Sequence, residues 1–296
     1  MPQHLSRRRL MQTSAATLLA ANLWPGRLFA DERGSGEFSF IEINDLHYID
    51  GECGHFFEKV VQQMKHTPGG IELALLVGDI TDKGTPDAEA KQREIFNALG
   101  VPYHVVPGNH DWMTDDDRSG YDAAFAGQYN YAFDHRGWQF IGLDTTDGTH
   151  YKDTTIGEPT FQWMDENLSK LDKSKPTVLF THFPMAPHAP FRPKNADGVL
   201  ERLKAFNLQA VFDGHFHGFT EEKINAAPVT TNKCCAYKKW NHDGTAEKGY
   251  FLVKAKDGKL TREFVEVKFP GMPPMPENTK PVRAATTNPY AQPAGK

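Results

Sequence analysis

Short apolar runs alternate with polar clusters along most of the chain. Five of these runs are rich in β-branched and aromatic residues and end at polar or turn-forming residues: 38–43, 73–77, 103–106, 177–180 and 210–212. Runs of this length and composition predict buried β-strands. Residues 86–99 and 161–171, which lie between the runs, have a helical pattern. Strands that alternate with helices predict an α/β fold.

The C-terminal part continues with strand-like stretches at residues 229–237, 249–254 and 260–267. Apolar and polar residues alternate in the third stretch, which suggests an antiparallel edge strand or a second sheet. Residues 270–296 hold many Pro, Thr and Ala residues, so we expect a disordered tail there. One domain is therefore expected to extend from residue 31 to residue 269.

The first thirty residues have the layout of a signal peptide, with a basic start and a short apolar stretch at residues 13–24. Arg7 and Arg8 follow Ser6, an arrangement similar to the twin-arginine consensus. We therefore expect the twin-arginine export machinery as a partner, cleavage after Ala30, and a periplasmic or secreted protein. The apolar stretch is too short to be a good transmembrane span, so no stable membrane anchor is expected.

The acidic charge balance limits the possible partners. The formal net charge is −5, and residues 1–30 contribute four arginines and no acidic residue. Without them, 29 basic residues (33 − 4) stand against 38 acidic ones, a net charge of −9. Electrostatic binding of nucleic acid needs a dense basic face. We therefore expect no nucleic-acid partner, and a nuclease is disfavoured.

The three cysteines are Cys53, Cys234 and Cys235. They form no Cys-x-x-Cys pair, which argues against a thiolate zinc site. In an exported protein Cys53 has two alternatives, a disulfide bond to one of the vicinal pair or a free thiol. Three buried thiols remain at least as good an interpretation as one bridge.

The polar clusters that follow the five predicted strands carry the candidate chemistry. In an open α/β sheet, ligands bind beyond the carboxyl ends of the strands, which is where these clusters fall. They contain nine carboxylate, amide or imidazole side chains: Asp45, His47, Asp79, Asp82, Asn109, His110, His182, His215 and His217. Imidazole with carboxylate favours Zn, Mn, Fe or Co over Mg and Ca. The set is large enough for two metal ions that share a carboxylate and clamp a phosphoryl group.

These residues form motifs that follow one another in a fixed order. The motifs are Asp45-x-His47, Gly78-Asp79-x-x-Asp82, Gly108-Asn109-His110-Asp111, His182, and Gly214-His215-x-His217. Together they resemble the calcineurin-like metallophosphoesterase superfamily, and most of all its branch of cyclic-nucleotide phosphodiesterases and glycerophosphodiesterases. The resemblance extends from about residue 38 to residue 267. It implies a four-layer α/β/β/α sandwich with two central mixed β-sheets.

The resemblance also implies a role for each residue around two divalent or mixed-valence metal ions (Mn, Fe, Zn or Co). The implied ligands are Asp45, His47 and His217 for the first ion, Asn109, His182 and His215 for the second, and Asp79 as the bridge between them. His110 would stabilise or protonate the leaving oxygen, and Asp82 would orient its imidazole. A metal-bridging hydroxide would attack phosphorus.

The expected function is an exported metal-dependent phosphoesterase that acts on a small phosphate ester, with a phosphodiester favoured. The alternatives are a phosphomonoesterase and a catalytically silent, metal-binding scaffold. The pair of His110 and Asp82 favours the enzyme, because a scaffold needs no such pair. Asp82 stands where purple acid phosphatases carry a tyrosine ligand, which argues against a ferric tyrosinate site.

Overall fold

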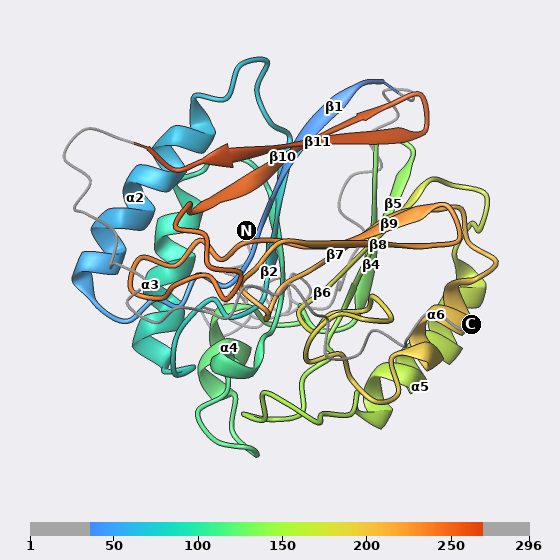
Figure 1. Cartoon of the computed structure of the whole chain (residues 1–296), viewed down its shortest axis with the longest axis horizontal. Helices are drawn as coiled ribbons and strands as arrows, with labels where there is room; N and C mark the ends of the chain where they lie inside the picture. The colour runs from blue at the N-terminus through green and yellow to red at the C-terminus, as the bar shows by residue number, and fades with distance from the viewer. Residues whose placement is uncertain (1–35, 269–296) are drawn as a thin grey trace, which may run out of the picture.

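Two mixed β-sheets face each other in the computed structural model, which describes residues 36–268 (Figure 1). The first sheet has the order β11 (Lys259–Glu266), β10 (Gly249–Lys256), β1 (Phe38–Ile43), β2 (Leu73–Val77) and β3 (Tyr103–Val106). Strands β1, β2 and β3 are parallel, whereas β10 and β11 are antiparallel to their neighbours. The alternation at residues 260–267 therefore belongs to an antiparallel edge strand, as predicted.

The second sheet is built around a parallel centre. Its order is β4 (Tyr131–His135), β5 (Trp138–Leu143), β6 (Thr177–Thr181), β7 (Leu208–Asp213), β9 (Ala227–Thr231) and β8 (Thr220–Ile224). Strands β5, β6, β7 and β9 are parallel, and the edge strands β4 and β8 are antiparallel to their neighbours. Parallel strands end at the same side of a sheet, so the segments after β6 and β7 lie close together.

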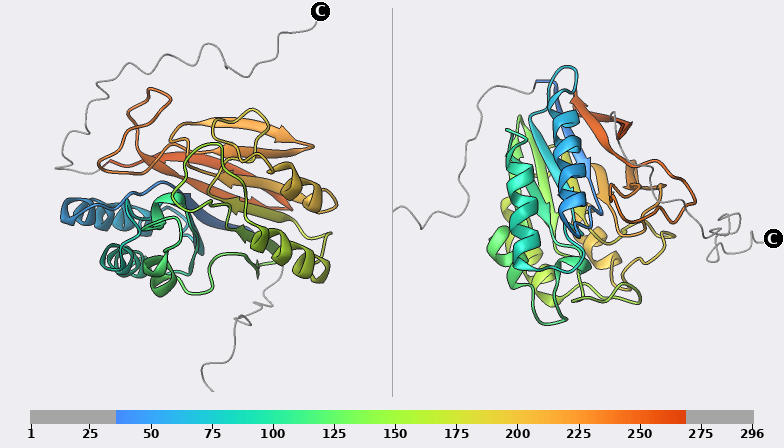
Figure 2. Two further views of the ribbon diagram at one scale, coloured as in Figure 1. Left: turned by 90° about the horizontal axis from the view of Figure 1, so that it is seen from below. Right: turned by 90° about the vertical axis from the view of Figure 1, so that its left-hand side faces the viewer.

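Helices cover the outer face of each sheet, which completes four layers (Figures 1 and 2). The first sheet packs against α2 (Gly51–Lys65), α3 (Pro86–Asn97) and α4 (Ser119–Ala124), and the second against α5 (Glu158–Asn167) and α6 (Asp197–Leu203). Short 3-10 helices occupy Asn109–Asp111 and Leu168–Lys170. The predicted α/β/β/α sandwich is confirmed.

Three apolar cores separate the four layers, and strand periodicity explains why. In β1, Phe40 points into the core between the two sheets, while Ile41 and Ile43 point toward the helices. Successive side chains of a strand lie on opposite faces, so a strand covered on both sides is apolar at most positions; the exceptions in β1 are Ser39 and the buried Glu42. Each fully buried side chain of this size contributes about 1.5–3 kcal/mol.

The sequence prediction was wrong or silent in parts of the fold. Residues 229–237 do not form one strand, because β9 ends at Thr231 and the chain continues into a loop. Helix α2 was missed, although Asp50 caps its N-terminus by accepting hydrogen bonds from the amides of Glu52 and Cys53. All three cysteines are buried free thiols, which rules out the alternative of a disulfide bond.

The signal peptide and the Pro-rich tail lie outside the described residues. In the part from residue 36 to residue 268, no helix combines the length and apolar character needed to cross a bilayer.

Candidate metal centre

The predicted site residues meet where the parallel strands of both sheets end. Asp45 and His47 follow β1, Asp79 follows β2, His182 follows β6, and His217 follows β7. Of the remaining four, Asp82 also follows β2, Asn109 and His110 follow β3, and His215 follows β7. All nine residues named from the sequence therefore lie at this end of the two sheets.

A first group of donors consists of Asp45, His47, Asp79 and His217, whose ligand atoms all lie within 4.8 Å of one another. His217 Nε2 is 3.2 Å from Asp45 Oδ1 and 2.9 Å from His47 Nε2. All four residues are buried. Carboxylates and imidazoles that converge in this way form a coordination set suited to a divalent first-row metal.

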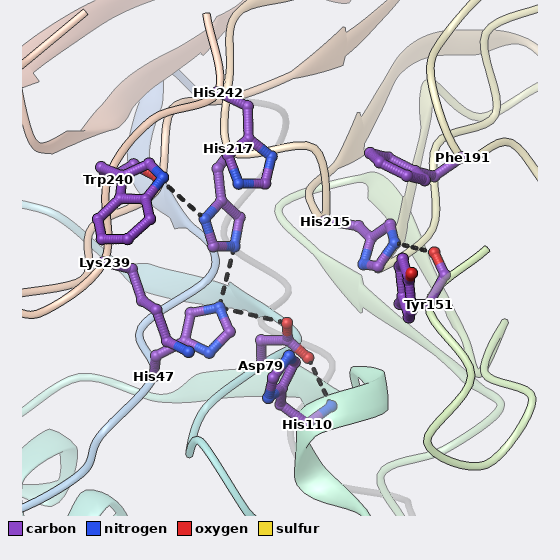
Figure 3. Close-up of a pocket in the computed structure, with 10 residues that line it drawn as sticks. All are labelled: His47, Asp79, His110, Tyr151, Phe191, His215, His217, Lys239, Trp240 and His242. Atoms are coloured by element: carbon purple, nitrogen blue, oxygen red, sulfur yellow. Dashed lines mark hydrogen bonds and ion pairs between the residues drawn. The ribbon is translucent and has the colours of Figure 1, made fainter. Parts of the chain in front are cut away.

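A second group shares Asp79 with the first. Its members are Asp79, His182 and His215, again with donor atoms within 4.8 Å of one another. The two oxygens of Asp79 face different groups: Oδ2 is 3.4 Å from His47 Nε2, and Oδ1 is 3.3 Å from His182 Nε2. Asp79 thus belongs to both groups, and Figure 3 shows its contact with His47 of the first group.

Unsatisfied buried atoms provide a test of whether metal ions fit this site. Among the described residues, Asn109 Oδ1 and His182 Nε2 are buried side-chain atoms without a hydrogen-bond partner. His182 Nδ1 donates to the carbonyl of Val77 at 3.1 Å, so Nε2, which faces Asp79, is the ring nitrogen left for coordination once it gives up its proton. Buried polar atoms in native proteins are nearly always paired. A metal ion would satisfy both atoms, so the residues present fit the implied group.

His215 and His217 are each held from outside by a backbone carbonyl. His215 Nε2 donates to the carbonyl of Tyr151 at 2.7 Å, and His217 Nδ1 donates to that of Trp240 at 3.3 Å. Metal-binding histidines usually donate their second ring N–H in this way, which fixes the tautomer and the ring orientation. The second ring nitrogen of each residue remains for coordination.

The backbone of the site is in an unusual conformation. Five site residues have φ values between 46° and 68°, in the left-handed region: Asp45, His47, Asp79, His215 and His217. Each non-glycine residue in this region costs roughly 1–2 kcal/mol. Hydrogen bonds between the loops that follow β1 and β2 hold this backbone in place. The Asp45 amide donates to the carbonyl of Gly78 at 3.1 Å, and the His47 amide donates to that of Asp79 at 2.9 Å. Strain of this kind concentrates at functional sites.

Two motif glycines let the backbone approach the donors. A Cβ atom at Gly108 would lie 2.2 Å from Asp79 Oδ1, and one at Gly78 would lie 2.4 Å from His182 Nδ1. Gly78 also has a φ of 76°. Any larger residue would displace the donor that it meets, which explains why these motifs contain glycine.

His110 lies at the rim of the site, where its side chain is 36% exposed. Its backbone amide donates to Asp79 Oδ1 at 2.9 Å, and its Nδ1 donates to the backbone carbonyl of Asp82 at 3.0 Å. The Asp82 carboxylate is farther away, at 3.6 Å from His110 Nδ1, and approaches His47 Nδ1 at 3.3 Å and Lys239 Nζ at 2.6 Å. Asp82 therefore holds His110 by its main chain, while its carboxylate lies between His47 and Lys239.

Burial and charge shift the pKa values of the donors in opposite directions. Burial would raise the pKa of Asp45, but the charge of His217 lowers it to about 2. Burial would lower the pKa of His182, but the Asp79 carboxylate raises it to about 9. Burial lowers the pKa of His47 to about 4 and that of His215 to about 3. The carboxylates thus create a strongly cation-attracting centre, and metal binding would release the proton that Asp79 stabilises on His182.

Behind His217 lies a polar pair that sequence reasoning did not identify. Lys248 Nζ donates to Cys234 Sγ at 2.9 Å, and both residues are buried. Burial would raise the pKa of the Cys234 thiol, but His217 and Lys248 lower it to about 7. Nothing in the spacing of these residues predicts their contact.

The open side of the site is a pocket of about 290 Å³. Four donors (His47, Asp79, His215 and His217) and His110 line it, and the rest of the lining consists of Tyr151, Phe191, Lys239, Trp240 and His242 (Figure 3). These five residues lie in long connections between elements and outside every motif, so the strand-end pattern could not find them.

Comparison with known proteins agrees with this geometry. A model of the family described as calcineurin-like phosphoesterase matches residues 38–219, more than half of the chain. A glycerophosphodiester phosphodiesterase of Enterobacter lignolyticus is 25% identical over 205 residues, which cover 62% of this chain and 69% of the relative. A 3′,5′-cyclic-nucleotide phosphodiesterase of a Nostoc species is 26% identical over 156 residues, 49% of this chain and 56% of the relative. The chain thus spans little more than half the length of the second relative.

The fold also agrees with solved structures. A dimetal phosphatase from Danio rerio superposes with a TM-score of 0.61 at 16% identity, over 77% of this chain and 95% of that one. Five motifs in order, two donor groups with a shared carboxylate and the matching family model lead to one conclusion. The chain belongs to the calcineurin-like phosphoesterase family and is a metal-dependent phosphoric ester hydrolase.

Proposed function

We propose that this protein is a binuclear phosphodiesterase. The observation that carries the proposal is Asp79, whose two oxygens face two separate groups of donors. The proposed ligands are Asp45, His47 and His217 for one ion and Asn109, His182 and His215 for the other, with Asp79 shared. Two such ions, when bound, would polarise the phosphoryl oxygens and activate a water molecule for attack.

The protein's own groups orient the ester and handle the leaving oxygen. Because His110 Nδ1 donates to the Asp82 carbonyl, Nε2 is the atom that can hold or deliver a proton in the pocket. Protonation of the leaving oxygen by a positioned imidazole typically contributes about 10²–10⁴-fold. The Asp79 carboxylate fixes the His110 backbone and so couples this group to the donors.

The charge of the pocket favours a diester over a monoester. Among the described residues that line it, Lys239 is the single lysine or arginine, and Asp82 already pairs with it at 2.6 Å. A diester carries one negative charge, whereas a monoester at neutral pH carries close to two. Both relatives compared above have names that denote phosphodiesterases. A phosphomonoesterase is the alternative.

The experiment compares bis(4-nitrophenyl) phosphate with 4-nitrophenyl phosphate on purified protein loaded with Mn²⁺, Zn²⁺, Co²⁺ or Fe²⁺. We expect the higher kcat/KM for the diester. A higher kcat/KM for the monoester would show that the protein is a phosphomonoesterase instead. Two bound ions per chain without turnover of either ester would contradict the proposed diesterase activity.

We also propose export by the twin-arginine route, which rests on Arg7 and Arg8 after Ser6. That route moves folded cargo, so the metals would be bound before export. Replacing both arginines with lysine should leave active precursor in the cytoplasm, as measured by cell fractionation and hydrolysis of a nitrophenyl ester. Undiminished periplasmic activity of the double variant would contradict this route.

A further inference from the structure

Two exposed aromatic side chains stand on opposite sides of the donor groups (Figure 3). Trp240 is 41% exposed and Tyr151 is 53% exposed, and both line the pocket. The described residues contain only four large apolar or aromatic side chains with such exposure, and two of them are these. Aromatic surface left in water beside a polar site marks a place where a ligand binds.

The backbone fixes both aromatic residues relative to the donors. The carbonyl of Tyr151 accepts a hydrogen bond from His215, and the carbonyl of Trp240 accepts one from His217. One aromatic surface is therefore tied to each donor group, since His215 and His217 belong to different groups. A phosphoryl group between the groups would have an aromatic surface on each side.

Each aromatic residue has further groups beside it. The Tyr151 ring lies 6.4 Å from the ring of Phe191, and Lys152 Nζ lies 5.5 Å from the centre of the Tyr151 ring. Trp240 follows Lys239, whose ammonium group pairs with Asp82. Both sides therefore combine an aromatic ring with a nearby cation, which suits a substrate with a flat group and a negative charge.

We propose that Trp240 and Tyr151 determine specificity by stacking against the two organic arms of a phosphodiester that carries a flat aromatic group, such as a nucleobase or an aryl ring. This inference rests on the proposed phosphodiesterase function and names its substrate class. A monoester has one arm and would leave one of the two surfaces uncovered. Stacking of a base on an aromatic side chain corresponds to an affinity gain of roughly 5- to 150-fold.

The test uses two diesters with the same leaving group, methyl 4-nitrophenyl phosphate and the 4-nitrophenyl ester of thymidine 5′-monophosphate. The variants are Trp240→Ala and Tyr151→Ala, and Phe219→Ala is the control. Phe219 is 47% exposed but does not line this pocket. Both main-chain carbonyls survive the substitutions, so elemental analysis should find unchanged metal content in every variant.

We expect Trp240→Ala and Tyr151→Ala to differ in which of the two esters they hydrolyse less efficiently. One should lower kcat/KM for the thymidine ester by roughly 5- to 150-fold and spare the methyl ester. The other, which contacts the nitrophenyl arm, should lower kcat/KM for both esters alike. Phe219→Ala should change neither value.

Two results would overturn the inference while leaving the proposed function intact. These are unchanged kcat/KM of both variants on both esters, and equal losses on both esters for both variants. If instead the unsubstituted, metal-loaded protein hydrolysed neither ester, the proposed function itself would fail.

Discussion

The donor groups and the aromatic surfaces are built in different ways. The seven proposed ligands are buried, with His215 the most exposed at 8%, and all follow directly from strand ends. Trp240 and Tyr151 are about half exposed and come from long loops. Buried strand ends hold donors to fixed positions, whereas loops vary without disturbing the core. The comparison indicates that this protein separates its chemistry from its selectivity, with His110 between the two.

The largest effect should come from the shared carboxylate. Asp79→Asn removes a negative charge that faces both donor groups, so metal content should fall at both, and hydrolysis should fall to background. His47→Ala is the matched control, because it removes a donor from one group alone and should release chiefly one ion. Elemental analysis of the two purified variants measures the number of metal ions per chain. Two tightly held ions in Asp79→Asn would show that this residue is not a bridge.

The next effect should come from His110, which belongs to neither of the two donor groups that share Asp79, although its ring centre lies 4.6 Å from that of His47. His110→Ala should keep two ions and lose about 10²–10⁴-fold in turnover of alkyl esters. The loss should shrink for 4-nitrophenyl esters, because nitrophenolate hardly needs a proton. Kinetics on both leaving groups, with metal analysis, are the measurement. A variant that lost an ion would make His110 a ligand, and full activity on alkyl esters would remove it from the mechanism.

A smaller effect is expected for Asp82→Asn. Its backbone carbonyl, which survives the substitution, holds His110, while its carboxylate contacts His47 and Lys239. The variant should therefore bind metal about 10-fold more weakly, as is typical for loss of a residue that orients a ligand. Its dependence on the leaving group should match that of the unsubstituted protein. Metal titration by calorimetry and kinetics on both ester types test this, and a changed leaving-group dependence with normal metal affinity would assign the carboxylate to His110 instead.

The smallest effect isolates backbone strain. His217 has a φ of 52°, so His217→Gly should be more stable than His217→Ala by about 1 kcal/mol. His182 is the control, because it is also buried but does not have a positive φ. There the order should reverse, with glycine less stable than alanine by roughly 0.5–1 kcal/mol. Urea unfolding of all four variants with a chelator present is the measurement. The same order at both positions would mean that the left-handed backbone is not strained.

The donors could be predicted from the sequence because each lies just after the end of a strand. An apolar run followed by Asp-x-His or Gly-Asn-His is a local pattern, and parallel strands then bring these patterns together. The aromatic surfaces could not be predicted in this way. Tyr151 and Trp240 lie in irregular loops, and tertiary contacts alone bring them to the pocket. The loop of Trp240 was even interpreted in part as a continuation of the strand that ends at Thr231.

The hydrogen bonds from His215 to Tyr151 and from His217 to Trp240 have a thermodynamic consequence. Each joins a proposed metal ligand to a residue of the pocket wall, so ion binding and ester binding act on the same two loops. If bound ions raise the affinity for the ester through these loops, then bound ester must raise the affinity for the ions by the same factor, because coupling between two sites is reciprocal. Through these loops, the affinity of the protein for metal ions therefore depends on the concentration of its substrate.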